Sequence, residues 1–230
     1  MFLWRAEVFP GVSVAFTDTG AGNLALHVGD HGPSVMRRRE ELDKAAGIAP
    51  RRFQYMNQVH GNDVAVLESA TAAPTADAMV SRRLPMAVMV ADCIPLVLVG
   101  DSGGAGPVLG VVHAGRPGLA SGVIPAAVDQ LRAAGARNIR AWLGPSICGR
   151  CYEVPAELRE EVAAVAPSAW SATTWGTPAL DLPAGAVSQL ESEGVLVEHR
   201  GPCTLETETL YSYRRDRNSG RFAGLVWTHE

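Results

Sequence analysis

The chain has 230 residues, a net charge of −4 and a hydrophobic content of 47%, which suit a globular protein with a substantial core. This acidic balance, with a pI near 5.9, excludes a general electrostatic affinity for nucleic acids or membranes. The N-terminus shows no basic stretch followed by a long apolar one, and no apolar run is long enough to cross a bilayer. We therefore expect a cytoplasmic protein with no nucleic-acid or membrane partner.

Strand and helix patterns alternate along the chain. Residues 12–16 alternate in polarity and contain β-branched side chains, which predicts a short strand. Helical periodicity runs over 34–47, where the final glycine is a typical helix terminator. Segment 51–68 then predicts two strands joined by a turn at Gly61-Asn62, so that His60 ends the first of them.

Short apolar β runs fill the middle of the chain, and helices alternate with strands in its last half. Segment 119–135 predicts an amphipathic helix, in which Pro125 either introduces a kink or marks the true start. Since no linker or repeat divides the chain, we predict an α/β (α+β) fold with mixed β-sheets flanked by helices, in one compact domain over 1–230. The further strands are expected at 86–93, 95–100, 108–115, 138–144, 195–199 and 221–227, and the further helices at 155–166 and 183–194.

Three side chains that can bind metals occur at the ends of predicted strands: His60, Cys93 and His113. Strand ends are where a rigid scaffold presents side chains to a site. Two imidazoles and one thiolate suit zinc and leave a fourth position open for water or substrate, and copper also accepts nitrogen and sulfur donors. The same residues allow two other interpretations. One is a nucleophile pair in which Cys93 attacks and a histidine is the base; the other is a set of structural hydrogen bonds.

The neighbouring Asp92 and the remaining cysteines also allow alternatives. Asp92 either orients a metal-bound histidine or caps a turn by accepting backbone N–H groups. Cys148 and Cys151 form a C-x-x-C pair, which is typical of a redox site or of two thiols packed near a turn. A zinc ribbon would need a second such pair, and the sequence has none, because Cys203 is distant from the other cysteines.

Arginines are concentrated in two parts of the chain, and one more follows His113 closely. Guanidinium groups bind phosphate or carboxylate through paired hydrogen bonds, so these clusters suit an anionic substrate, whereas the alternative is a solvated surface. No P-loop, Rossmann glycine motif, H-E-x-x-H or G-x-S-x-G motif occurs. The arginines concerned are Arg37, Arg38, Arg39, Arg116, Arg214, Arg215, Arg217 and Arg221.

Five motifs in this order resemble those of the YfiH family, also called the laccase-domain or polyphenol-oxidase-like family, which includes bacterial purine nucleoside phosphorylases. The resemblance extends over nearly the whole chain, from FTDTG at residue 16 to the final strand pattern. The motifs are NQVHGNDV (57–64), ADCIPLVL (91–98), VVHAG (111–115), LGPSICGRCYEV (143–154) and YSYRRDRNSGR (211–221).

This resemblance implies a catalytic metal site formed by His60, Cys93 and His113, with zinc or copper as the ion. It implies phosphorolysis of adenosine, inosine and methylthioadenosine to the free base and ribose 1-phosphate, so purine nucleosides and phosphate are the expected partners. Adenosine deamination, copper-dependent oxidation of phenols and peptidoglycan-precursor editing are further activities associated with the family. A laccase couples several coppers and would need more ligands than the six histidines readily supply.

The expected substrate contacts are less regular than the metal ligands. The family's HAGWRG motif is HAGRPG here, so Arg116 stands where tryptophan is usual and Pro117 where arginine is usual. If the usual arginine binds phosphate, Arg116 would replace it from one position away. The candidate substrate contacts are Arg39, Gln58, Asp92, Arg116 and Arg215.

Overall fold

Two β-sheets form the centre of the fold in this computed structural model, which describes residues 1–104 and 106–229. The first sheet is antiparallel throughout, and the second is mixed, with parallel pairing at both of its edges. In sheet order, the first contains β1 (Phe2–Phe9), β2 (Val12–Thr17), β12 (Phe222–Thr228) and β5 (Met86–Val90). The second contains β11 (Leu196–Arg200), β8 (Arg137–Leu143), β6 (Ile94–Asp101), β7 (Val108–Ala114), β4 (Ala78–Ser81) and β3 (Val64–Val66). Strands β9 (Trp170–Ala172) and β10 (Pro178–Leu180) form a separate small ladder.

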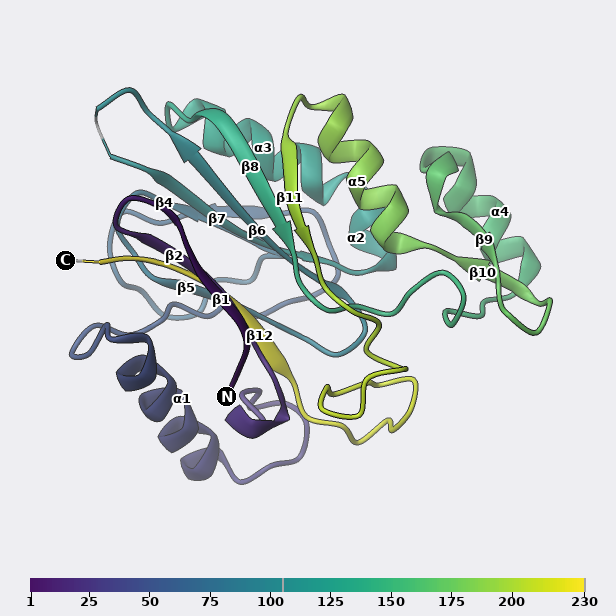
Figure 1. The fold of residues 1–230 in the computed structure, drawn as a ribbon, viewed down its shortest axis with the longest axis horizontal. Coiled ribbons are helices and arrows are strands. Elements are labelled where there is room, and N and C mark those ends of the chain that lie inside the picture. Colours follow the sequence, from purple (N-terminus) through teal and green to yellow (C-terminus); the bar gives the residue numbers. More distant parts are fainter. Residues whose placement is uncertain (105, 230) are drawn as a thin grey trace.

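Helices cover the outer faces of the two sheets, so the molecule has four layers (Figure 1). Helix α1 (Gly32–Ala46) packs on the first sheet, and the other four helices lie on the side of the second. Apolar side chains of both sheets, such as Val88 and Val97, meet in the central core. The other helices are α2 (Arg116–Ala120), α3 (Val123–Ala133), α4 (Ala156–Val165) and α5 (Leu182–Ser192), with short 3₁₀ turns η1 (Thr19–Ala21) and η2 (Pro167–Ala169). The predicted single α+β domain with mixed sheets is confirmed.

The hairpin predicted over 51–68 is wrong. Only Val64–Val66 forms a strand there, and the preceding segment touches its neighbours through isolated bridges at Gln54 and Asn57. His60 therefore lies in a loop with a left-handed backbone, at φ 62°, rather than at the end of a strand. Phe53 and Met56 of this segment are buried in the cores beside the first sheet although their backbone is irregular, and local periodicity does not distinguish such residues from those of a strand.

The helix predicted over 119–135 is divided into two. Gly122 adopts a left-handed conformation at φ 85° and separates α2 from α3. Pro125 lies in the first turn of α3, where its missing N–H has no intrahelical partner to lose, so the proline marks the start of a helix and not a kink. Within residues 1–104 and 106–229, no helix is long and apolar enough to cross a membrane.

Candidate metal centre

Strand pairing brings two of the three predicted ligands to the same end of the second sheet. In the antiparallel register of β6 with β7, Pro95 lies opposite His113. The prediction that Cys93 ends a strand is wrong, because β5 ends at Val90 and Cys93 lies in the short link before β6, two residues ahead of Pro95. The imidazole of His113 is held on a rigid strand pair that is buried over most of its length, and the thiol lies next to the start of that pair.

A buried carboxylate, Asp77, positions both histidines. One of its oxygens accepts the backbone N–H of His60 at 2.9 Å and lies 2.7 Å from Nδ1 of His113. The other oxygen accepts the backbone N–H groups of Val59 at 3.2 Å and Gly61 at 2.7 Å. The side chain of Asp77 is 0% exposed, so these partners replace all of its water. Because Nδ1 of His113 bonds Asp77, its Nε2 is left as the ligand nitrogen.

The three predicted ligands converge on a common point. The sulfur of Cys93 lies 3.8 Å from Nε2 of His60, and the rings of His60 and His113 meet edge to face with centroids 4.6 Å apart. One ligand atom from each residue lies within 4.8 Å of the others. These separations suit donors that share one metal ion, and two nitrogens with one sulfur are a donor set for zinc or copper.

Gly115 allows this convergence. A Cβ atom at this position would lie 2.7 Å from Cδ2 of His60 and 3.2 Å from the sulfur of Cys93. Any larger residue would push the His60 ring or the thiol out of place. The glycine of the VVHAG motif is therefore explained by a close approach of the backbone to the ligand side chains.

Asp77, His113 and Cys93 interact as a row of groups whose favoured charges alternate in sign. Burial by itself would raise the pKa of Cys93, but the charge and hydrogen bonds of the histidines outweigh it and lower the pKa to about 6. Burial likewise opposes protonation of His113, yet the Cys93 thiolate and the Asp77 carboxylate raise its pKa to about 9. Without metal, Cys93 and His113 are therefore a thiolate–imidazolium pair at neutral pH, and metal binding displaces the imidazolium proton.

A pocket of about 510 Å³ opens over His60 and Cys93, a volume suited to a small organic ligand. Three arginines line it together with two tyrosines, so its wall offers positive charge beside the ligands. Arg214 also stacks on Tyr152, with its guanidinium carbon 5.0 Å from the ring centroid. The lining residues are His60, Ala91, Asp92, Cys93, Arg116, Pro117, Ile147, Tyr152, Leu182, Tyr213, Arg214 and Arg217.

Asp92 lines this pocket, but its carboxylate is committed to the surrounding loops. It accepts a hydrogen bond from the hydroxyl of Thr204 at 2.6 Å and from the backbone N–H of Arg214 at 2.6 Å. Its backbone is left-handed, at φ 79°. The carboxylate that orients His113 is thus Asp77, whereas Asp92 fastens two loops that form the pocket wall.

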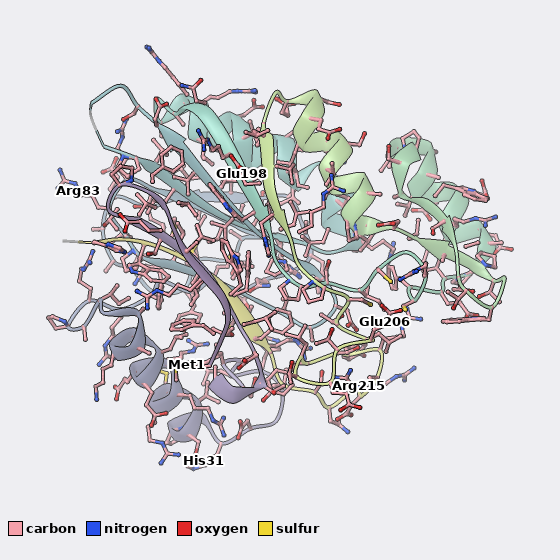
Figure 2. The ribbon with its side chains drawn as sticks, in the orientation of Figure 1. Met1, His31, Arg83, Glu198, Glu206 and Arg215 are labelled. Carbon is pink, nitrogen blue, oxygen red and sulfur yellow. The ribbon has the colours of Figure 1, made fainter. Side chains whose placement is uncertain are left out.

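The structure does not bring every predicted substrate contact to the pocket. Among the described lining residues are Arg116 and Asp92 but not Arg39, Gln58 or Arg215. Gln58 pairs through its amide with both backbone groups of Met89, at 2.7 and 3.0 Å. Arg39 stacks on Tyr55 and donates to the Leu24 carbonyl, while Arg215 donates to four carbonyls between Thr204 and Leu210 (Figure 2 shows Arg215 in this loop region).

Sequence reasoning missed Asp77 as a positioning group and Tyr152 as a pocket residue. Asp77 sits between apolar residues in TADAMV, immediately before β4, and a charged residue in such a run is a signal of a buried partner. Arg214 and Arg217 were noticed only as members of a cluster, since their spacing from Cys93 is too long for any local motif. The geometry thus defines an α+β protein in which a His-Cys-His group that could hold a metal ion lies beside an arginine-lined pocket.

The chain is similar to known proteins over nearly its whole length. A family model described as multi-copper polyphenol oxidoreductase laccase matches residues 9–229. Proteins named purine nucleoside phosphorylase from Streptomyces griseus and Streptomyces coelicolor are 45% and 47% identical, covering 96% and 97% of this chain and 96% and 98% of their own. A Neisseria meningitidis structure assigned to DUF152 superimposes with a TM-score of 0.83 at 32% identity, covering 100% of this chain and 99% of that one.

The chain therefore belongs to this laccase-like family, and the predicted resemblance is confirmed. The family model is named as a multi-copper polyphenol oxidoreductase, whereas the Streptomyces relatives are named as purine nucleoside phosphorylases.

Proposed function

We propose that the protein is a metal-dependent purine nucleoside phosphorylase, which acts on adenosine, inosine and methylthioadenosine in the cytoplasm. The observation that carries this proposal is the meeting of a His-Cys-His ligand set and three arginines in one pocket. The names of the Streptomyces relatives supply the purine nucleoside and phosphate as substrates.

The arginines of the pocket suit the phosphate. In phosphorolysis a phosphate oxygen bonds to C1′ of ribose, the bond from C1′ to the base breaks, and the base takes up a proton. Guanidinium groups keep their charge at any physiological pH and bind phosphate oxygens in pairs. Arg116, Arg214 and Arg217 border the pocket from two different segments and can hold the phosphate against the ribose.

Tyr152 provides a neutral donor in the same pocket. Burial raises its pKa, and the nearby Cys93 adds to this effect, while Arg116 and Arg214 only partly oppose it. The phenol therefore stays protonated at neutral pH. It can donate a hydrogen bond to the substrate as negative charge develops on the departing base.

His60, Cys93 and His113 would hold zinc, and the donor set fits because the ligand atoms converge and Asp77 fixes the tautomer of His113. A zinc ion with one open position supplies a Lewis acid to a bound oxygen or nitrogen. The same three residues also suit copper, and this donor set is the observation that favours the alternative function, copper-dependent oxidation of phenols. Coupled multi-copper chemistry would need further ligand sets, and the only other candidate group among the described residues contains no histidine.

The proposal is tested by incubating the zinc-loaded protein with each nucleoside, with and without phosphate, and measuring free base and ribose 1-phosphate. We expect equal amounts of both products, in the presence of phosphate only. Inosine formed from adenosine without phosphate would reveal the deaminase activity, which we include as a second activity of the same centre. Failure to release base from any nucleoside would overturn the proposal.

Three control reactions separate the alternatives. Oxidation of a phenol by copper-loaded protein, without base release, would support the oxidase. Base release that persists after complete metal removal would favour a Cys-His nucleophile. Binding of peptidoglycan precursors by metal-free protein that is inactive on every nucleoside would support a role in their editing.

A further inference from the structure

A second group of metal-binding side chains lies outside the pocket. Cys148, Cys151, Cys203 and Glu206 each place one ligand atom within 4.8 Å of the others. Cys151 is buried, Cys148 and Cys203 are half-buried, and Glu206 is exposed, so the group lies just below the surface. Figure 2 shows Glu206 in the loops at the edge of the molecule.

The four residues form two pairs with the same spacing. Cys148-Gly149-Arg150-Cys151 and Cys203-Thr204-Leu205-Glu206 each leave two residues between the donors, a spacing typical of zinc ligands on tight turns. The first pair is closed by a turn, in which the N–H of Cys151 donates to the carbonyl of Cys148 at 3.0 Å. The second pair that a zinc ribbon needs is thus present, but it ends in a carboxylate and so escapes a search for cysteines.

Backbone hydrogen bonds fix these two turns against each other. Ser146 and Cys203 form a parallel bridge, and the N–H of Thr204 donates to the carbonyl of Ser146 at 3.1 Å. The N–H of Cys148 donates to the sulfur of Cys203 at 3.4 Å. An N–H group that donates to a cysteine sulfur stabilises the thiolate form, which is the form that binds metal.

The donor set selects the kind of metal. Three sulfurs and one carboxylate favour zinc over magnesium or calcium, which prefer oxygen alone. Four protein ligands also complete a tetrahedron and leave no open position, as in structural zinc sites. Arg150 lies within the C-x-x-C turn with Nη2 4.0 Å from Glu206, and its charge offsets part of the negative charge of such a site.

We propose that Cys148, Cys151, Cys203 and Glu206 bind a structural zinc ion, separate from the metal centre in the pocket. This ion would join the turn that follows β8 to the loop that follows β11. Both segments reach the pocket wall, because Ile147 lines the pocket and Thr204 donates to Asp92. The second zinc therefore stabilises the wall without contacting the substrate.

Zinc content measured by mass spectrometry tests the proposal, using full-length protein purified under reducing conditions. We expect two zinc ions per chain in the wild type, one in Cys93→Ala, one in Cys151→Ser and none in the double variant. X-ray absorption by Cys93→Ala should show a sulfur-dominated zinc environment with Zn–S distances of about 2.3 Å. Cys93→Ala protein without zinc, or with zinc bound only by nitrogen and oxygen, would overturn the proposal.

A second variant keeps the test decisive if Cys151→Ser fails to fold. In the Cys93→Ala background, Glu206→Gln should weaken zinc binding about tenfold, measured by competition with a chelator, because one charged ligand is lost. Glu208→Gln, at an exposed position two residues away, should leave the affinity unchanged. Equal effects of the two changes on zinc affinity would count against the site. Titration of two fewer free thiols than expected would also count against it, because it would indicate a disulfide in place of zinc.

Discussion

The two cysteine-containing clusters of this protein differ in the number of ligands and in the state of their thiols. His60, Cys93 and His113 offer three ligands and border a pocket of about 510 Å³. The second cluster offers four ligands and lies outside the lining of that pocket. A three-ligand site leaves room for substrate, whereas a four-ligand site is closed. In our proposals the same chain thus combines an open centre for chemistry with a closed site for stability.

Their thiols differ for a physical reason. Cys93 lies beside two imidazoles, one of them held as a cation by Asp77, and its pKa falls to about 6. Burial raises the pKa of Cys151, and its neighbours Cys148 and Cys203 raise it further because thiolates repel each other. Without a metal ion the raised pKa values of Cys151 and Cys203 favour their neutral thiols, whereas the lowered pKa of Cys93 favours its thiolate.

The largest expected effect separates the two clusters by activity. Cys93→Ala should reduce phosphorolysis by about three orders of magnitude, or 4 kcal/mol of transition-state stabilisation, because the sulfur ligand is lost. Its thermal midpoint should change little, since Cys93 is half-buried in a link between strands. Product formation and thermal unfolding are measured on the same samples. If Cys93→Ala lost activity only because the protein unfolded, the distinction between the two clusters would be contradicted.

The opposite result is expected for the second cluster. Cys151→Ser should lower the thermal midpoint by about 6–12 °C, since loss of the metal removes about 3 kcal/mol and each kcal/mol is worth about 2–4 °C in a domain of this size. Differential scanning fluorimetry of zinc-loaded samples measures the shift. An unchanged midpoint would show that the cluster makes no contribution to stability.

Asp77→Asn tests how the open site is held. The amide can still accept a hydrogen bond, but it lacks the negative charge that adds to the effect of Cys93 on His113, and its NH₂ group would face backbone N–H donors. We expect zinc affinity and activity to fall about 10- to 100-fold. Asp63→Asn, at an exposed position nearby, is the matched control and should have no effect. Equal zinc affinities of the two variants would contradict the positioning role of Asp77.

Alkylation of metal-free protein compares the thiols directly. Because the pKa of Cys93 is lowered, its thiolate persists down to about pH 6 and is lost below that value. At pH 7 iodoacetamide should therefore modify Cys93 about tenfold faster than Cys151, even though a low pKa reduces intrinsic nucleophilicity. Peptide mass spectrometry gives both rates. A midpoint near pH 9 for Cys93 would contradict the thiolate–imidazolium pair.

The smallest effect concerns the arginines of the pocket. Arg217→Ala should raise the KM for phosphate about fivefold, or 1 kcal/mol, because one of several charged contacts is removed. The KM for inosine should change less. Arg37→Ala, an exposed arginine on α1, is the control. If kcat fell while the KM for phosphate stayed unchanged, Arg217 would not be one of the residues that bind phosphate.

Much of the fold could be predicted from local patterns. The glycine after α1 and the apolar runs of β5 to β7 are strong signals because they reflect capping and burial within a few residues. The segment 51–60 was mistaken for a strand, and its last part is shaped by the carboxylate of Asp77, which lies outside that segment and accepts the N–H groups of residues 59–61. Local periodicity carries no information about such a partner.

The two candidate metal-binding clusters also differ in how far the sequence alone predicts them. The motifs around His60, Cys93 and His113 were recognisable as an ordered set, but residue spacing alone did not pair them. The second cluster was hidden, because Cys203 and Glu206 approach Cys148 only through the pairing of two distant loops. Gln58 and Arg215 belong to two of the five motifs and Arg39 lies in the first helix, yet the side chains of all three donate hydrogen bonds to backbone carbonyls of the protein.

The central claim is that ribose transfer depends on a metal in the open, three-ligand cluster. It is tested most directly by returning zinc to metal-free protein while following phosphate-dependent release of hypoxanthine from inosine. In the wild type, activity should rise with zinc and reach its maximum when the Cys93 cluster is filled; in Cys93→Ala it should stay at background however much zinc is bound. Full activity of the metal-free protein, or of Cys93→Ala, would contradict the claim.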